Sequence, residues 1–122
     1  DTIEVVTTQV LGSLPGIASN VDAMIAYEPV WAIGTGMVPE IGEIADVHSA
    51  IRGEVAKIKG PAVAEKIRLL YGGSVKPGNV SEILSIDDVD GVLVGGASLS
   101  GDDFWSLCVN TAKLFAILSK KV

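Results

Sequence analysis

Three short apolar segments, separated from one another by helical patterns, give the strongest indication of the fold. They cover residues 24–27, 67–71 and 92–94. Each is mainly apolar without regular alternation and adjoins turn residues, which is typical of a strand that is buried on both faces of a parallel sheet. Strands that alternate with helices form parallel βαβ units with right-handed crossovers. The sequence therefore predicts an α/β fold with three parallel strands.

Four helices are predicted around these strands. Apolar residues recur at spacings of three and four over 2–14 and over 41–58, and Gly60-Pro61 is expected to end the second helix. A short helix is expected over 79–84, and the last one begins near Asp102-Asp103, whose charges suit a helix amino end. The residues that this last helix is expected to bury are Phe104, Leu107, Cys108, Leu114, Phe115 and Leu118.

Composition argues against several classes of function. The chain has 122 residues with a formal net charge of −6, which allows one domain and makes nucleic acid an unexpected partner. No apolar run reaches membrane-spanning length and no signal-peptide pattern is found, so we expect no membrane contact. The single cysteine, Cys108, cannot form an internal disulfide, which favours a reducing, cytoplasmic location.

A carboxylate, Glu28, follows the first predicted strand and precedes an apolar, glycine-bounded loop. The carboxyl ends of parallel strands carry the ligand sites of α/β folds. Partial desolvation between the strand and the loop would make this carboxylate a better proton acceptor. The alternative is an ordinary surface glutamate at the end of a strand.

Two glycine-rich turns follow the second and third strands, Gly72-Gly73-Ser74 and Gly95-Gly96. Small residues at these positions suit a close approach of the backbone to another group, and free N–H groups at a helix amino end attract anions. Two such turns on neighbouring strands predict a phosphate site. The alternative is a pair of ordinary strand-to-helix turns.

For three further residues we compare a functional role with a structural one. His48 lies on the apolar stripe of a crossover helix, away from the loops, and is expected to be structural. Cys108 is expected to be a small core residue. Trp31, in a glycine-bounded loop, is expected to be a docking side chain of a lid that closes over the site.

The run AYEPVWAIGTG over 26–36 resembles the active-site signature of the triosephosphate isomerase family. The resemblance continues in YGGSV over 71–75 and in DGVLVGGASL over 90–99, in the family's order and spacing. It implies a (β/α)8 TIM barrel, of which residues 1–122 are the carboxyl-terminal part, from the fifth helix through the eighth with three parallel strands.

The same resemblance implies roles for individual residues. Glu28 is implied as the general base that moves a proton between the carbons of dihydroxyacetone phosphate and glyceraldehyde 3-phosphate, through an enediol(ate). Gly34, Ser74, Gly95 and Gly96 match the positions that bind the substrate phosphate. No cofactor and no metal ion is implied. A mobile lid is implied over Pro29, Val30, Trp31, Ala32, Ile33, Thr35 and Gly36.

The family's active site also needs a lysine, a histidine and an asparagine from the first half of the barrel, which do not match this chain. Asp1 leads almost directly into a helical pattern, so we expect a piece of a larger protein that acts with a complementary amino-terminal half. A homodimer is implied for the complete enzyme. Two alternatives are a phosphate-binding half-barrel without catalysis and a fragment that associates through its open sheet edges.

Overall fold

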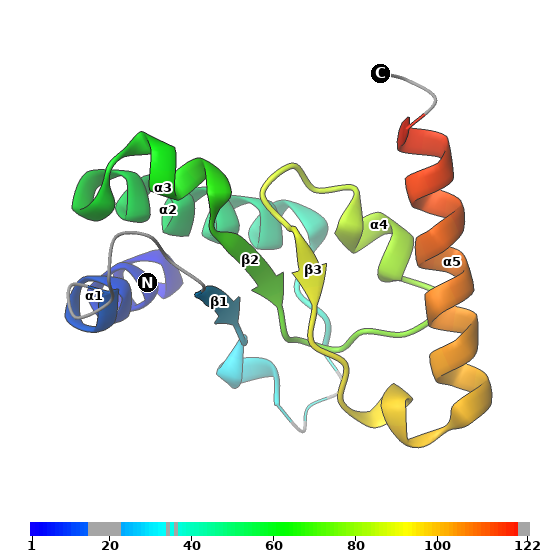
Figure 1. Cartoon of the computed structure of the whole chain (residues 1–122). Coiled ribbons are helices and arrows are strands. Elements are labelled where there is room, and N and C mark those ends of the chain that lie inside the picture. Colours follow the sequence, from blue (N-terminus) through cyan, green and yellow to red (C-terminus); the bar gives the residue numbers. More distant parts are fainter. Residues whose placement is uncertain (15–22, 34, 36, 120–122) are drawn as a thin grey trace.

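The three strands form one parallel sheet in the order β1-β2-β3, and the predicted α/β class is confirmed. The computed structural model describes residues 1–14, 23–33, 35 and 37–119. The strands are β1 (Met24–Tyr27), β2 (Arg68–Tyr71) and β3 (Gly91–Val92). Tyr27 pairs with Tyr71, and Tyr71 pairs in turn with Val92, so the three strands end in register (Figure 1).

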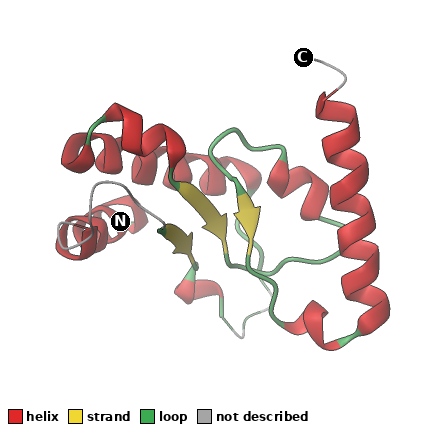
Figure 2. Ribbon diagram, in the orientation of Figure 1, coloured by secondary structure: helices red, strands yellow, loops and turns green. Residues whose placement is uncertain are grey.

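Five α-helices and two short 3₁₀ helices are found in the described part of the chain (Figure 2). In Figure 1, α1 lies beside β1 at one end of the sheet, and α5 lies beyond α4 at the other end. No helix among the described residues combines the length and the apolar character that crossing a membrane requires. The helices are α1 (Thr2–Ser13), η2 (Val30–Ala32), α2 (Ile41–Lys59), α3 (Pro61–Lys66), α4 (Val80–Leu84), η3 (Gly96–Leu99) and α5 (Gly101–Ser119).

Helix α2 has sequence signals at both ends. Glu40 and Glu43 form a capping box, in which Oε2 of Glu43 accepts a 3.0 Å hydrogen bond from the Glu40 N–H. Gly60, with φ 91°, ends the helix in a conformation that favours glycine. Pro61 then begins α3, a helix absent from the predicted elements although proline is common at a first helical position.

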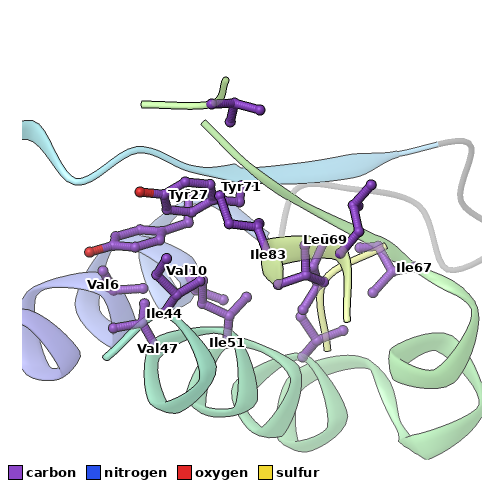
Figure 3. Close-up of a cluster of buried hydrophobic side chains, with 14 of the residues drawn as sticks. Val6, Val10, Tyr27, Ile44, Val47, Ile51, Ile67, Leu69, Tyr71 and Ile83 are labelled. Carbon is purple, nitrogen blue, oxygen red and sulfur yellow. The ribbon is translucent and has the colours of Figure 1, made fainter. Parts of the chain in front are cut away.

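The hydrophobic core lies between the helices and one face of the sheet (Figure 3). Val6 and Val10 of α1 and the buried stripe of α2 pack beneath the side chains of the strands. The strand residues that point into this core are Tyr27, Leu69 and Tyr71. The α2 residues of the stripe are Ile44, Val47, His48, Ile51 and Val55.

The prediction that the strands are buried on both faces is wrong for this structure. Met24 keeps 60% of its surface exposed, and Ala26 is also exposed, while Tyr27 on the other face is buried. The reason is that the helices cover a single face of the sheet. The third strand is also shorter than predicted, since Leu93 lies beyond it and is half exposed.

Helix α5 buries less of its apolar stripe than predicted. Leu107 is buried, and Cys108 and Leu114 are partly buried. Phe104, Phe115 and Leu118 are exposed, which contradicts their predicted burial. The physical reason is that α5 packs chiefly against the short elements α4 and η3, which cover only part of its surface.

Candidate active site

The three strands end side by side, so the loops that follow them begin at one edge of the sheet. The Gly72 N–H donates a 2.8 Å hydrogen bond to the Tyr27 carbonyl, and the Leu93 N–H donates a 2.9 Å bond to the Tyr71 carbonyl. A Cβ placed on Gly72 would lie 3.8 Å from the Cβ atoms of both Glu28 and Leu93. Glu28 therefore lies on the exposed face of the sheet, next to the first glycine-rich turn.

A pocket of about 970 Å³ lies at this edge and brings most of the predicted site residues together. Its lining includes Glu28 from the end of β1, Ser74 from the loop after β2, and Gly95 and Gly96 from the loop after β3. Gly34, the fourth predicted phosphate-binding residue, lies outside the described residues. Residues as far apart in the sequence as 28 and 96 thus share one cavity.

The side chain of Glu28 is exposed in this structure. The sequence predicted a partly desolvated carboxylate between a buried strand and an apolar loop. That prediction is wrong for the described residues, because Glu28 extends from the face of the sheet that the helices leave uncovered.

Gly73 confirms the prediction that a turn glycine permits a close approach. A Cβ placed on Gly73 would lie 2.9 Å from Cε1 of Tyr71 and closer still to the Tyr71 hydroxyl. Gly95 and Gly96 differ, since a Cβ on either would have no described atom within 4 Å. Only the first turn therefore needs glycine for packing among the described residues.

Free backbone donors line the pocket. The N–H groups of Ser74, Val75, Gly95 and Gly96 donate no hydrogen bond to any described residue. All four residues belong to the pocket lining. Backbone N–H groups that have no partner and belong to one pocket lining are the kind of donors that bind anions.

An asparagine that the sequence analysis missed holds the first of these loops. The Asn79 side chain bonds the carbonyl of Ser74 and the N–H of Lys76, so it spans the turn that carries Ser74. From α5, Nδ2 of Asn110 donates a 2.8 Å bond to the Pro77 carbonyl. The available signal was an asparagine at the start of the helix expected over 79–84, a place where asparagine commonly bonds nearby backbone.

The predicted lid contains a short helix rather than an irregular loop. Within η2, Val30 and Trp31 are exposed, while Ala32 and the residue after the helix, Ile33, line the pocket beside Glu28. After it, Oγ1 of Thr35 donates a 2.8 Å bond to the Ala32 carbonyl and accepts a 3.1 Å bond from the Met37 N–H. Pro29, at the start of the lid, is buried. Gly36, like Gly34, lies outside the described residues.

Trp31 lies at a second pocket, apart from the candidate phosphate loops. This apolar pocket of about 620 Å³ is formed between α1 and β1, and its lining includes Val5, Met24 and Trp31. Trp31 therefore lines the pocket beside α1 and β1, and it does not belong to the lining that Ser74, Gly95 and Gly96 share.

His48 is a buried core residue, as predicted. Its ring lies 5.9 Å from that of Tyr27 in an edge-on arrangement and 6.3 Å from that of Tyr71. Nδ1 lies 3.1 Å from the carbonyl oxygen of Asp88, and Nε2 has no partner among the described residues. Burial lowers the pKa of His48 and raises those of Tyr27 and Tyr71. His48 is therefore held neutral within the core.

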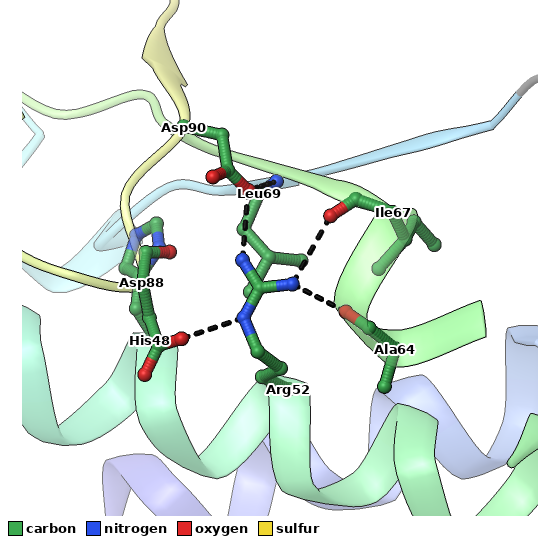
Figure 4. A network of polar contacts seen from close by, with 7 residues as sticks. All are labelled: His48, Arg52, Ala64, Ile67, Leu69, Asp88 and Asp90. Carbon is green, nitrogen blue, oxygen red and sulfur yellow. Dashed lines mark hydrogen bonds and ion pairs between the residues drawn. The ribbon is translucent and has the colours of Figure 1, made fainter. Parts of the chain in front are cut away.

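Behind the site, Arg52 joins α2 to the segment that enters β3 (Figure 4). Its guanidinium donates to Oδ1 of Asp88 over 2.6 Å and to Oδ2 of Asp90 over 2.7 Å. It also donates to the carbonyls of Ala64 and Ile67, at the end of α3. This network fixes the start of β3, and hence the position of the loop that carries Gly95 and Gly96.

Known proteins resemble this chain over most of its length. The family model "Triosephosphate isomerase" matches residues 1–111. The triosephosphate isomerase of Ruegeria pomeroyi is 53% identical over 103 residues, and that of Jannaschia sp. is 55% identical over 103 residues. Each of these alignments covers 84% of this chain and 41% of the relative. The triosephosphate isomerase of Hydrogenovibrio crunogenus is 56% identical over 93 residues, which cover 76% of this chain and 36% of the relative.

The chain thus spans about two-fifths of the length of the curated relatives it matches. The matched residues include all three strands and the loops that follow them. The chain belongs to the triosephosphate isomerase family.

Proposed function

We propose that this chain carries the base, the lid and the phosphate-binding loops of a triosephosphate isomerase, as the second half of a (β/α)8 barrel. The reaction is the interconversion of dihydroxyacetone phosphate and glyceraldehyde 3-phosphate in glycolysis and gluconeogenesis, in the cytoplasm. The observation that carries the proposal is that Glu28, Ser74, Gly95 and Gly96 line one pocket.

In this mechanism Glu28 takes a proton from one substrate carbon and returns it to the neighbouring carbon through an enediol(ate). Backbone N–H groups at Ser74, Gly95 and Gly96 hold the phosphate, together with Gly34. The lid, whose residues Ala32 and Ile33 line the pocket, closes over the substrate. Closure excludes water, which protects a reactive intermediate and strengthens the electrostatic contacts within the site.

The proposed site is completed by a complementary amino-terminal half-barrel. The exposed side chains of Met24, Ala26 and Leu93 support this, because they form an apolar face with no described element over it. The apolar pocket between α1 and β1 lies along the open edge of the same sheet. Uncovered strand edges and apolar faces favour pairing with another segment. The complete enzyme is proposed to be a homodimer.

The test is isomerisation of glyceraldehyde 3-phosphate by the purified chain from a host without its own isomerase. The amino-terminal part of the Ruegeria pomeroyi relative, up to the residue aligned with Asp1, is added in a second series. We expect activity only in the mixture, and we expect Glu28→Gln to abolish it. Activity of the chain alone would contradict the requirement for the other half, and an inactive mixture that nevertheless assembles would overturn the isomerase proposal.

A non-catalytic phosphate-binding half-barrel is the second candidate. It is favoured by the unpartnered N–H groups of Ser74, Val75, Gly95 and Gly96, which need no other half to be present. Binding of inorganic phosphate by a chain that stays inactive in the mixture would support it.

A self-associating fragment is the third candidate. It is favoured by the exposed aromatic side chains of α5, such as Phe104 and Phe115, together with the uncovered face of the sheet. Sedimentation at several concentrations distinguishes it, because a monomer at every concentration would exclude it.

A further inference from the structure

We propose that Asn79 is a positioning residue of the phosphate-binding loop: its carboxamide sets the direction of the Val75 N–H, which the loop after β2 offers to an anion. This inference rests on the proposed phosphate site and adds a residue that touches no substrate. Asn79 acts through the backbone of the turn from Ser74 to Lys76.

The carboxamide holds both ends of this turn. Nδ2 donates a 2.9 Å hydrogen bond to the Ser74 carbonyl, and Oδ1 accepts a 2.8 Å bond from the Lys76 N–H. The first bond fixes the peptide plane between residues 74 and 75, and the second fixes the plane between residues 75 and 76. The C=O and N–H of a planar trans peptide point in opposite directions. Holding the Ser74 carbonyl therefore turns the Val75 N–H away from Asn79.

Asparagine meets the chemical requirement of this position. The turn presents one acceptor and one donor to the same side chain, and a carboxamide supplies the matching donor and acceptor from one short, planar group. Aspartate would keep the acceptor for the Lys76 N–H but would lose the donor to Ser74. The two backbone partners also assign which end of the amide is nitrogen.

The two hydrogen bonds of the Asn79 carboxamide, called the clamp below, come from a residue that is fixed to the core. Asn79 directly precedes α4, and its carbonyl accepts a 3.1 Å bond from the N–H of Ile83. Val80 and Ile83 are fully buried, and Val75, in the middle of the turn, is buried as well. The turn is thus held from the core on one side and by the carboxamide on the other. A hydrogen bond from a side chain that is held in place can orient a backbone N–H for binding. A hydrogen bond from a mobile side chain cannot.

Loss of the Asn79 carboxamide is expected to weaken phosphate binding more than it weakens folding. Without the carboxamide, both peptide planes can rotate, and the orientation of the Val75 N–H must be regained when an anion binds. The loss corresponds to one or two net hydrogen bonds, so we expect phosphate to bind about tenfold more weakly.

The experiment titrates the isotope-labelled chain with inorganic phosphate and follows the amide signals of Ser74, Val75, Gly95 and Gly96. Asn79→Ala removes both side-chain bonds and is expected to raise the dissociation constant about tenfold. Asn79→Ser is a milder variant, since serine is favoured before a helix and its hydroxyl can accept from a nearby N–H. It is expected to give a dissociation constant between those of the unsubstituted chain and Asn79→Ala. If the alanine variant does not fold, the serine variant is used for the test.

Asn110→Ala is the matched control, because it removes a carboxamide that bonds the same loop at Pro77, beyond the clamped turn. We expect it to change the dissociation constant less than about twofold. If the folded Asn79 variants bind phosphate with a dissociation constant within twofold of that of the unsubstituted chain, the role of Asn79 is overturned while the proposed phosphate site stands. Equal weakening by the Asn79 and Asn110 variants would also overturn it, as it would show a general need for loop stability. No shift in the unsubstituted chain would instead overturn the proposed phosphate site, and the inference with it.

Discussion

Arg52 and Asp90 form a 2.7 Å ion pair that connects the crossover helix α2 to the start of β3. The same oxygen of Asp90 accepts a 2.8 Å hydrogen bond from the Leu69 N–H, and the Asp90 N–H donates a 2.8 Å bond to the Leu69 carbonyl. One carboxylate thus joins α2, β2 and β3 beneath the candidate site (Figure 4).

Replacing Arg52 should therefore destabilise the fold. Arg52→Met leaves the carboxylates of Asp88 and Asp90 partly buried and without their cation, and we expect the free energy of unfolding to fall by about 2–4 kcal/mol. Urea denaturation measures the change. Lys57→Met is the control, because it breaks a single local pair with Glu54 in which the lysine side chain is 73% exposed, and it should cost less than about 1 kcal/mol. Equal effects of the two substitutions would contradict the structural role of the Arg52 network.

His48 should make the stability depend on pH. Its pKa is lowered by burial from the ordinary value of 6.5, against the opposing influence of Asp88 and Asp90, so the unfolded chain binds a proton more readily than the folded one. Stability from the neutral ring is therefore complete above pH 6.5 and declines as the pH falls toward the lower, folded-state pKa. Urea midpoints between pH 7.5 and pH 5 measure this loss, over a window in which most carboxylates stay ionised.

His48→Asn is the matching variant, since its carboxamide can still donate to the Asp88 carbonyl but does not titrate. We expect it to be less stable at every pH and to show a flatter pH dependence between pH 7.5 and pH 5. An unchanged slope in this variant would assign the pH dependence to other groups.

Gly73 should tolerate no side chain. In Gly73→Ala the new methyl group meets the hydroxyl and ring of Tyr71, which is fully buried, and we expect a loss of about 1–3 kcal/mol in the free energy of unfolding. Gly78→Ala is the control on the same loop, where a Cβ meets no described atom within 4 Å. Thermal unfolding of both variants tests the difference, and equal melting temperatures would show that the contact with Tyr71 is unimportant.

The exposed stripe of α5 should drive association of the chain. Phe104 and Phe115 lie on the stripe that the sequence pattern marks as apolar, yet both are exposed. We expect the double change Phe104→Lys and Phe115→Lys to shift sedimentation toward the monomer without lowering stability. Ile117→Lys is the control, as Ile117 is similarly exposed but lies on another face of the helix. The expectation fails if Ile117→Lys dissociates the chain as effectively.

Apart from α3, the order of α-helices and strands could be predicted from the sequence, as could the loops that carry the candidate site, because they depend on local patterns. Spacings of three and four along α2 mark the stripe that contains His48, and short apolar runs mark the strands. The common edge of parallel strand ends then predicts that Glu28, Ser74 and Gly95 lie close together, as the shared pocket bears out. Their catalytic and binding roles remain proposals.

The remaining features depend on contacts between residues far apart in the chain. An apolar pattern shows that a surface favours burial, but whether Met24 or Phe115 is covered depends on which elements pack against it, and here both stay exposed. The pairing of Arg52 with Asp90 and the clamp of Asn79 on Ser74 depend on distances and angles that form only when the elements are assembled. The spacing of apolar residues reflects which side of each segment is more stable in the core than in water. Hydrogen bonds and burial also require partner residues, which only the folded chain brings together.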